Sequence, residues 1–305
     1  MASLASCSST PRALNSNSTG PAFQLPNGRY LDACLIFKAG WTEWHELLLR
    51  GTHAKPEPSS YQPYAHAPLV PRFAYDAASA CHVTRIILVR NPYERLLSYY
   101  LDKIVASCNH GPHPKPQCSK SGYWPVGLPL NASLYQTIHH VTKPDAKFGS
   151  RLGELHYAPI ATTYSWCLRN GRVEDRRVLK LERVDGWYAP LVAELGLREV
   201  ASSGWKTGNA GGCFYVPRGK SCATALEIPS TADASSSSSS EGGGGNASAT
   251  RTTTMRHNRG ARDKLLEYYD AATAKLVTLH YKADLEAFGY AEWDGQSEYR
   301  PWEDL

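Results

Sequence analysis

The sequence predicts an α/β protein with three layers, in which a mostly parallel central sheet lies between helices. Two observations predict this class. A short apolar run is followed by a helical pattern twice in succession, which is typical of parallel strands joined by helices. The chain also has 305 residues, of which 42% are hydrophobic and 20% charged. This is an ordinary globular composition that can bury a sizeable core.

The first predicted unit starts with a buried strand at Ala33–Phe37. A turn of small residues, Lys38-Ala-Gly-Trp, follows it. We expect Thr42 to cap the next helix, which should end at Gly51, because Thr accepts a hydrogen bond at a helix start and Gly is common at a helix end.

The second unit starts with a strand at Arg85–Val89. Asn91 is then the expected cap, Pro92 takes the first helical position, and Glu94 is spaced to reach back to the cap. Apolar residues recur after it at helical spacing: Leu96, Leu97, Tyr100 and Ile104.

The second half of the chain adds a third strand at Val178–Leu181 and a short helix at 187–195. Residues Ala261–Lys282 are amphipathic. Their apolar side is expected to hold Leu265, Leu266, Tyr269, Ala272, Leu276 and Leu279.

The predicted domain is interrupted once. Six consecutive serines and four glycines occupy Ser235–Ser240 and Gly242–Gly245, so we expect a flexible insert there. The predicted organisation is a disordered tail at 1–25, a core at 26–228, the insert at 229–254, a helical part of the same domain at 255–295, and a tail at 296–305.

Charge and hydropathy exclude several classes. The 33 basic and 28 acidic residues leave a net charge of +5, which is too small to indicate nucleic-acid binding. No apolar run approaches the roughly 18–20 residues of a membrane span, and the N-terminus has no signal-peptide pattern. A collagen, a coiled coil and a wholly disordered chain are also excluded.

Eight cysteines and three glycosylation sequons bear on the compartment. The pairs Cys108/Cys118 and Cys213/Cys222 could each close a short disulfide loop, and sequons start at Asn17, Asn131 and Asn246. Together these features favour the secretory lumen as the compartment. The missing signal peptide or anchor argues in the opposite direction. Cys108, His110, His113 and Cys118 also have the residue types of a metal site, and a disulfide is the favoured reading.

Cations stand at the end of each of the first two predicted strands. Lys38 precedes Gly40 and Thr42 at a helix start, where free N–H groups and the helix dipole favour a phosphate-like anion. Arg90 stands at the carboxyl end of a strand, where open α/β sheets bind ligands. Ser98, two helical turns later, shares an anion with Arg90 only if the helix crosses the pocket.

This pairing resembles the Golgi carbohydrate sulfotransferase family, which includes the chondroitin sulfotransferases. That family has C-x-x-P-K-x-G-x-T-x-W, matched by Cys34, Lys38, Gly40, Thr42 and Trp44 with Phe37 in place of Pro. Its second motif, R-[DN]-P-[FY]-x-R-L-x-S-[AY]-Y-x-D-K, is matched from Arg90 to Lys103. Three further landmarks occur in the family's order: His156-Tyr-Ala-Pro, Lys180-Leu-Glu-Arg-Val and the segment from Tyr281 to Tyr290.

The resemblance implies a sulfotransferase fold related to P-loop nucleotide-binding proteins. The implied donor is 3′-phosphoadenosine 5′-phosphosulfate, with no metal. Lys38 would stabilise the leaving oxygen, and Arg90 and Ser98 would hold the 3′-phosphate. The 5′-phosphate would bind Thr42 and the amides of Ala39, Gly40, Trp41 and Thr42. His156 is the expected base for the acceptor hydroxyl, with Glu43 as the alternative.

The resemblance further implies a carbohydrate acceptor, no nucleic acid, a Golgi-lumenal location and a membrane link only through an N-terminal anchor that this chain lacks. Two rival functions stay open. One is a nucleotide-dependent kinase of the same fold, and the other is a non-catalytic glycan- or nucleotide-binding relative. Phe37 and Tyr157, where the family has Pro and Trp, are the residues that keep the second rival open.

Overall fold

A four-stranded sheet forms the centre of the computed structural model. The structure describes residues 22–25, 27, 29–51, 83–106, 124–129, 131–143, 146–147, 155–164, 176–202 and 260–299. The strands lie in chain order: β1 (Ala22–Gln24), β2 (Tyr30–Leu35), β3 (Val83–Val89) and β4 (Arg177–Lys180). β1 pairs antiparallel with β2, and the pairs β2–β3 and β3–β4 are parallel. The predicted mostly parallel sheet is confirmed.

Alternate residues of the central strands enter two different apolar clusters. Leu31, Ala33 and Leu35 of β2 join Ile86 and Leu88 of β3 in one cluster. That cluster also contains side chains from α1 (Trp41–Gly51), α7 (Val184–Glu194) and α8 (Arg198–Ser202). The intervening residues of the same two strands, Cys34, Ile87 and Val89, join the second cluster. Both faces of the sheet are therefore buried, as a parallel sheet requires.

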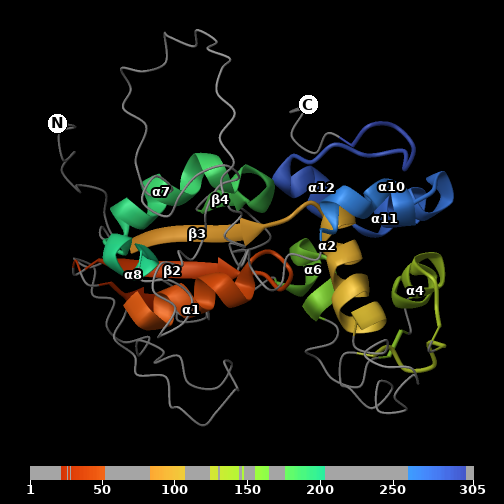
Figure 1. Cartoon of the computed structure of the whole chain (residues 1–305), viewed down its shortest axis with the longest axis horizontal. Coiled ribbons are helices and arrows are strands. Elements are labelled where there is room, and N and C mark those ends of the chain that lie inside the picture. The colour runs from red at the N-terminus through yellow and green to blue at the C-terminus, as the bar shows by residue number, and fades with distance from the viewer. Residues whose placement is uncertain are drawn as a thin grey trace, which may run out of the picture.

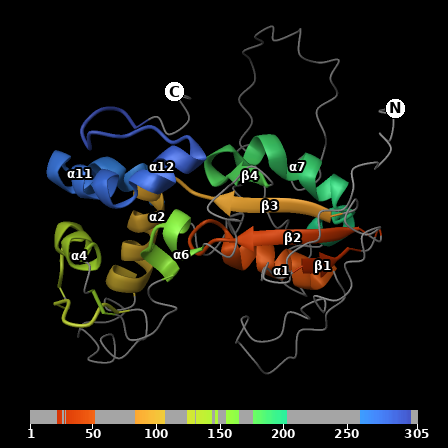
Figure 2. The same ribbon diagram turned by 180° about the vertical axis from the view of Figure 1, so that it is seen from behind.

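The second cluster continues beyond the carboxyl ends of β2 and β3. There α2 (Pro92–Tyr99) runs into a π-helical stretch, η3 (Tyr100–Val105). Figures 1 and 2 both show α2 beside α6 (Ile160–Thr163) and α12 (Lys282–Phe288), past the arrowheads of these strands. The remaining helices of this part are α4 (Leu134–Val141), η6 (Arg262–Lys264), α10 (Leu265–Tyr268) and α11 (Ala271–His280).

The element boundaries differ from the prediction at the first turn. β2 ends at Leu35, not Phe37, because the Ile36 carbonyl accepts a hydrogen bond from the Ala39 amide (3.0 Å) and so starts the turn while Ile36 is fully buried. α1 begins at Trp41, so Thr42 lies inside the helix and is not its cap. The expected strands at Arg85–Val89 and Val178–Leu181 exist as β3 and β4, with shifted ends.

The predicted apolar side of Ala261–Lys282 is confirmed at Leu265 and Tyr269, which are buried, and wrong at Leu266, Ala272 and Leu279, which are exposed. The chain breaks after α10, and Asp270 caps α11 by accepting from the Thr273 amide (2.7 Å). The break changes the helical phase, so Ala274 and Val277 are buried. Leu266 and Leu279, which were expected on the apolar side, are 59% and 64% exposed.

The globular part extends further at both ends than predicted. β1 lies within the expected tail 1–25, and the ring of Tyr299, within the expected tail 296–305, lies 5.1 Å from that of Trp293. Several predictions concern residues outside the described part: the insert at 229–254, the sequons at Asn17 and Asn246, and the motif Cys108, His110, His113 and Cys118 with the pair Cys213/Cys222. In the described residues, no helix has the length and hydropathy of a membrane span.

Candidate functional site

The first basic turn is built from backbone conformations that few residues adopt. Lys38 has φ +66° and Gly40 has φ +81°, so the chain turns twice through the left-handed region between β2 and α1. Glycine adopts this region without a steric cost, whereas lysine does so only when its surroundings hold it there. A Cβ on Gly40 would lie 3.6 Å from Leu181 Cδ1, so backbone conformation explains the glycine better than space does.

The turn delivers the N-terminus of α1 to the end of β2. The Gly40 carbonyl accepts from the Trp44 amide (3.0 Å), which makes Gly40 the first residue to join the helix. The amides of the first turn of a helix have no hydrogen-bond partner within the helix and can bind an anion. The Ala39 amide, by contrast, donates to Ile36. An anion at this turn would therefore be held by the amides of Gly40, Trp41 and Thr42 and not by that of Ala39.

The second cation meets the first turn directly. Arg90 follows β3, and its Nη1 donates to the Lys38 carbonyl at 3.4 Å. Its Nε and Nη2 donate to Glu94 Oε2 at 3.2 and 3.1 Å. The two basic turns therefore lie side by side at the carboxyl edge of the sheet, because β2 and β3 are adjacent and parallel.

The Lys38 ammonium forms an ion pair with Asp102, which lies in η3. Burial lowers the pKa of Lys38 to about 8, and the Asp102 carboxylate acts in the opposite direction. Burial would raise the pKa of Asp102, but the ammonium groups of Lys38 and Lys103 hold it well below its usual range. Lys103 Nζ lies 3.1 Å from the same carboxylate. At neutral pH Lys38 is thus a partly buried cation whose proton is less tightly held than usual.

Ser98 lies on the helix between the partners of the two cations. It follows Glu94 by four residues and precedes Asp102 by four, which places it on the same side of the helix as both. Glu94 contacts Arg90, and Asp102 contacts Lys38. The helical segment α2–η3 therefore passes next to both basic turns. This is the arrangement that Ser98 needs if it is to share an anion with Arg90.

Arg95 joins the first turn to the segment that carries His156. Its guanidinium is 1% exposed and donates to three carbonyls: Phe37 (3.1 Å), Ala158 (2.9 Å) and Leu155 (3.2 Å). Asp284 of α12, also 1% exposed, lies 4.0 Å from Arg95 Nη1.

Asp284 extends this buried network to α6. Its two carboxylate oxygens accept from the amides of Ile160 and Ala161 at 2.8 and 2.7 Å. Burial raises the pKa of Asp284, and the Arg95 charge opposes that shift. Four segments distant in the chain are thus joined behind Lys38: the first turn, α2, residues 155–161 and α12.

The expected base, His156, is buried next to the first turn. Its residue is 4% exposed, and its ring stacks on Phe37 with centroids 4.4 Å apart. Phe37 in turn stacks on Trp41 (5.2 Å), and Trp41 stacks on His45 (4.5 Å). Phe37, which stands where the resembling motif C-x-x-P-K has proline, therefore has a packing role in a four-ring stack. Glu43, the alternative base, is in α1, and its side chain lies outside the described part.

Glu182 connects β4 to the second turn. It lies in η5 (Leu181–Arg183), and its Oε1 accepts from the Asn91 amide at 2.6 Å. Its Oε2 accepts from the Tyr290 hydroxyl at 3.0 Å. Burial and the neighbouring Glu94 raise the pKa of Glu182 to about 7.

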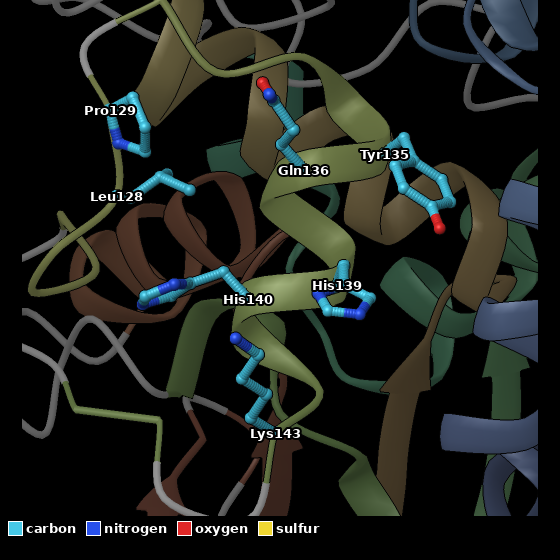
Figure 3. A pocket seen from close by; sticks show the side chains of 7 residues that line it. All are labelled: Leu128, Pro129, Tyr135, Gln136, His139, His140 and Lys143. Atoms are coloured by element: carbon cyan, nitrogen blue, oxygen red, sulfur yellow. The ribbon is translucent and has the colours of Figure 1, made fainter.

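A separate shallow pocket of about 190 Å³ lies over α4. Figure 3 shows His140 on one side of the helix with Leu128 and Pro129, and Tyr135 with His139 on the other. Figure 1 places α4 beyond α2 from the sheet. The pocket shares no lining residue with the basic turns. It is lined by Leu128, Pro129, Tyr135, Gln136, His139, His140 and Lys143.

Comparison with known proteins gives a match for the segment that contains both basic turns. A family model described as the sulfotransferase family matches residues 22–157. The match supports a sulfotransferase family. It begins at β1 and includes Lys38, Arg90, Ser98 and His156. No curated protein and no solved structure matches the chain.

The sequence analysis assigned no role in the site to three residues that the structure brings there. Asp102 and Arg95 lie within the second motif, and Glu94 was expected to reach back to the helix cap but pairs with Arg90. Spacing held a signal for two of them. Glu94 follows Arg90 by four residues with the opposite charge, and Asp102 follows Ser98 by four. The partners of Arg95 are distant carbonyls, which no local pattern indicates.

Proposed function

We propose that the protein transfers the sulfuryl group of 3′-phosphoadenosine 5′-phosphosulfate to a carbohydrate hydroxyl, in line and without a metal. The observation that carries the proposal is the contact between Arg90 and the Lys38 backbone. This contact supports one anionic ligand spanning both turns. The sulfotransferase family match over residues 22–157 supports sulfuryl transfer as the reaction class.

The proposed chemistry assigns a role to each turn. The N-terminal amides of α1 and Thr42 would hold the 5′-phosphate, and Lys38 would neutralise the charge that develops on the leaving oxygen. Arg90, a planar bidentate donor, and Ser98 would hold the 3′-phosphate. The Lys38 ammonium must be protonated for this role, and its pKa of about 8 leaves it mostly so at neutral pH.

His156 is the proposed base that takes the acceptor proton. His156→Phe tests this assignment, because phenylalanine keeps the ring against Phe37 and removes the basic nitrogen. We expect the substitution to lower kcat by about 10²–10⁴-fold, the usual contribution of a general base. Normal thermal unfolding would show that the stack survives. Retained turnover would assign His156 to packing and leave Glu43 as the candidate base.

The proposed place of action is the Golgi lumen, with a glycan as the acceptor and no nucleic-acid partner. The exposed Asn131 of one sequon lies just before α4, which agrees with this proposal without testing it.

Transfer of radiolabelled sulfate to a panel of glycans, with a chelator present, tests the proposed function. The expected result is labelled glycan from the sulfated donor and none from labelled ATP. Metal-dependent transfer of phosphate would identify a kinase. Tight nucleotide binding with no turnover on any glycan would identify a binding protein.

A further inference from the structure

Arg95 binds the backbone next to both residues that the proposed chemistry needs. Its Nε donates to the carbonyl of Phe37 (3.1 Å), the residue directly before Lys38. Its Nη2 donates to the carbonyl of Leu155 (3.2 Å), the residue directly before His156. One guanidinium therefore contacts the two peptide units that lead into the proposed leaving-group cation and the proposed base.

The guanidinium is a rigid spacer between these two peptide units. Its N–H donors lie in one plane in a fixed fork, so covalent geometry sets the directions and the separation of their acceptors. The third nitrogen, Nη1, donates to the Ala158 carbonyl (2.9 Å). The Arg95 side chain is 1% exposed, so bulk water does not replace a partner that is lost.

Residues 155–161, which carry the proposed base, belong to no strand, and side chains hold them in place. Asp284 of α12 binds the far end of this segment. Its Oδ2 and Oδ1 accept from the amides of Ile160 and Ala161 at 2.8 and 2.7 Å. Asp284 is also 1% exposed, and its Oδ2 lies 4.0 Å from Arg95 Nη1. Two buried groups of opposite charge thus fix both ends of the segment.

We propose that Arg95, supported by Asp284, is a positioning residue that sets the distance between Lys38 and His156. The inference rests on the proposed function, because it uses the roles proposed for these two residues. Arg95 acts through the backbone next to each of them.

The reaction explains why this distance matters. The bond from sulfur to the 5′-phosphate oxygen breaks, a bond from sulfur to the acceptor oxygen forms, and the acceptor proton passes to His156. The two oxygens lie on opposite sides of sulfur, so Lys38 and His156 must act at a fixed separation. A misplacement of about 1 Å can lower the rate of such a step by about 100-fold.

The test is a double-variant cycle on kcat with Arg95→Lys and His156→Phe. Lysine keeps the charge next to Asp284 but lacks the planar fork that holds both carbonyls. We expect Arg95→Lys to lower kcat for transfer of radiolabelled sulfate to a glycan by about 10–100-fold. In the His156→Phe background the same substitution should lower kcat by less than about threefold, because the group that it misplaces is already gone. A purely structural role would give equal losses in both backgrounds.

Binding of adenosine 3′,5′-bisphosphate separates positioning from damage to the donor site. The proposed contacts of this nucleotide are to the two basic turns and not to His156. Calorimetric titration of Arg95→Lys should therefore give an affinity close to that of the parent protein, so the loss should appear in kcat and not in donor binding.

Leu191→Ala is the control for lost stability. Leu191 is fully buried in α7 and belongs to the cluster on the other face of the sheet. A cavity there should lower the midpoint of urea denaturation. At a temperature where the variant is folded, its kcat should equal that of the parent.

Asp284→Asn is the second variant, and it decides the matter if Arg95→Lys does not fold. Asparagine has the shape of aspartate but only one accepting oxygen, so the amide of Ile160 or of Ala161 loses its acceptor. We expect kcat to fall less than in Arg95→Lys, at unchanged bisphosphate affinity, and only when His156 is present.

Failure of the inference is distinguishable from failure of the proposed function. If the parent protein transfers no sulfuryl group, the proposed function fails and the inference fails with it. If the parent is active but Arg95→Lys keeps more than about half of its kcat, or loses the same factor in both backgrounds, the inference is overturned and the proposed function stands. Retained turnover in His156→Phe alone overturns the base assignment and the inference, but not sulfuryl transfer.

Discussion

The two strand–turn–helix units meet at one edge of the sheet, but different parts of the chain hold them. The first turn depends on backbone conformation, with left-handed residues at Lys38 and Gly40. The second depends on side chains. Asn91 accepts from the Tyr93 amide (3.0 Å), Pro92 starts α2, and all eight residues of that helix are buried.

The two cations differ in the same way. Arg90 finds its partner, Glu94, four residues along the chain, whereas Lys38 pairs with Asp102, 64 residues away. The orientation of Arg90 is therefore largely a local matter. The orientation of Lys38 is fixed only once α2 and η3 have packed against the first turn, because its partner Asp102 lies in η3.

Arg95→Ala should have the largest effect on this arrangement, because Arg95 of the second unit holds the Phe37 carbonyl of the first. Removal leaves Asp284 buried without its cation, for which we expect a loss of about 3–5 kcal/mol in the free energy of unfolding. Urea denaturation measures it. Arg177→Ala is the control, since that side chain is 47% exposed in its ion pair and should cost less than about 1 kcal/mol. An equal loss in the free energy of unfolding in both variants would show that Arg95 does not bridge the two units.

Lys38→Ala comes next and tests the cation of the first turn. Under the proposed mechanism kcat should fall by about 10²–10³-fold, because charge on the leaving oxygen loses its stabilising group. Steady-state transfer assays measure it. Lys103→Ala removes the other lysine at Asp102 and should keep most activity. Near-normal turnover of Lys38→Ala would remove Lys38 from the mechanism.

Asp102→Asn tests whether the distant partner of Lys38 controls its protonation. The active form of Lys38 is protonated, so kcat/KM should decline as pH rises through about 8. Without the carboxylate the ammonium loses an interaction that raises its pKa, and the decline should start about one pH unit lower. The pH–rate profile of variant and parent measures this shift. An unchanged alkaline limb would show that Lys38 is not the group that titrates.

Asn91→Ala should have the smallest effect of the four. It removes the cap of α2, for which we expect a loss of about 1 kcal/mol in the free energy of unfolding. Asn91→Ser keeps a capping oxygen and should recover most of that stability. If alanine costs nothing, packing alone determines where α2 begins.

Local signals were sufficient for much of the fold. Three of the four strands were recognisable as short apolar runs, whereas β1 lies in a segment that was expected to be a tail. Asn91-Pro-Tyr-Glu predicted the start of α2, because capping and proline geometry act within a few residues. The same signals were insufficient for the end of β2 and for the helical phase after Asp270. In both places, a hydrogen bond in a turn or cap interrupts the apolar pattern.

The sequence by itself determined where the two basic turns lie and their order, because cations, glycine and helix starts act over a few residues, and it predicts a phosphate-like anion for them. Only the tertiary structure decided that Asp102 holds Lys38, that Arg95 joins four distant segments, and that Glu182 accepts a hydrogen bond from the Asn91 amide. These outcomes depend on burial and on the distance between charges, and neither exists until the chain has folded.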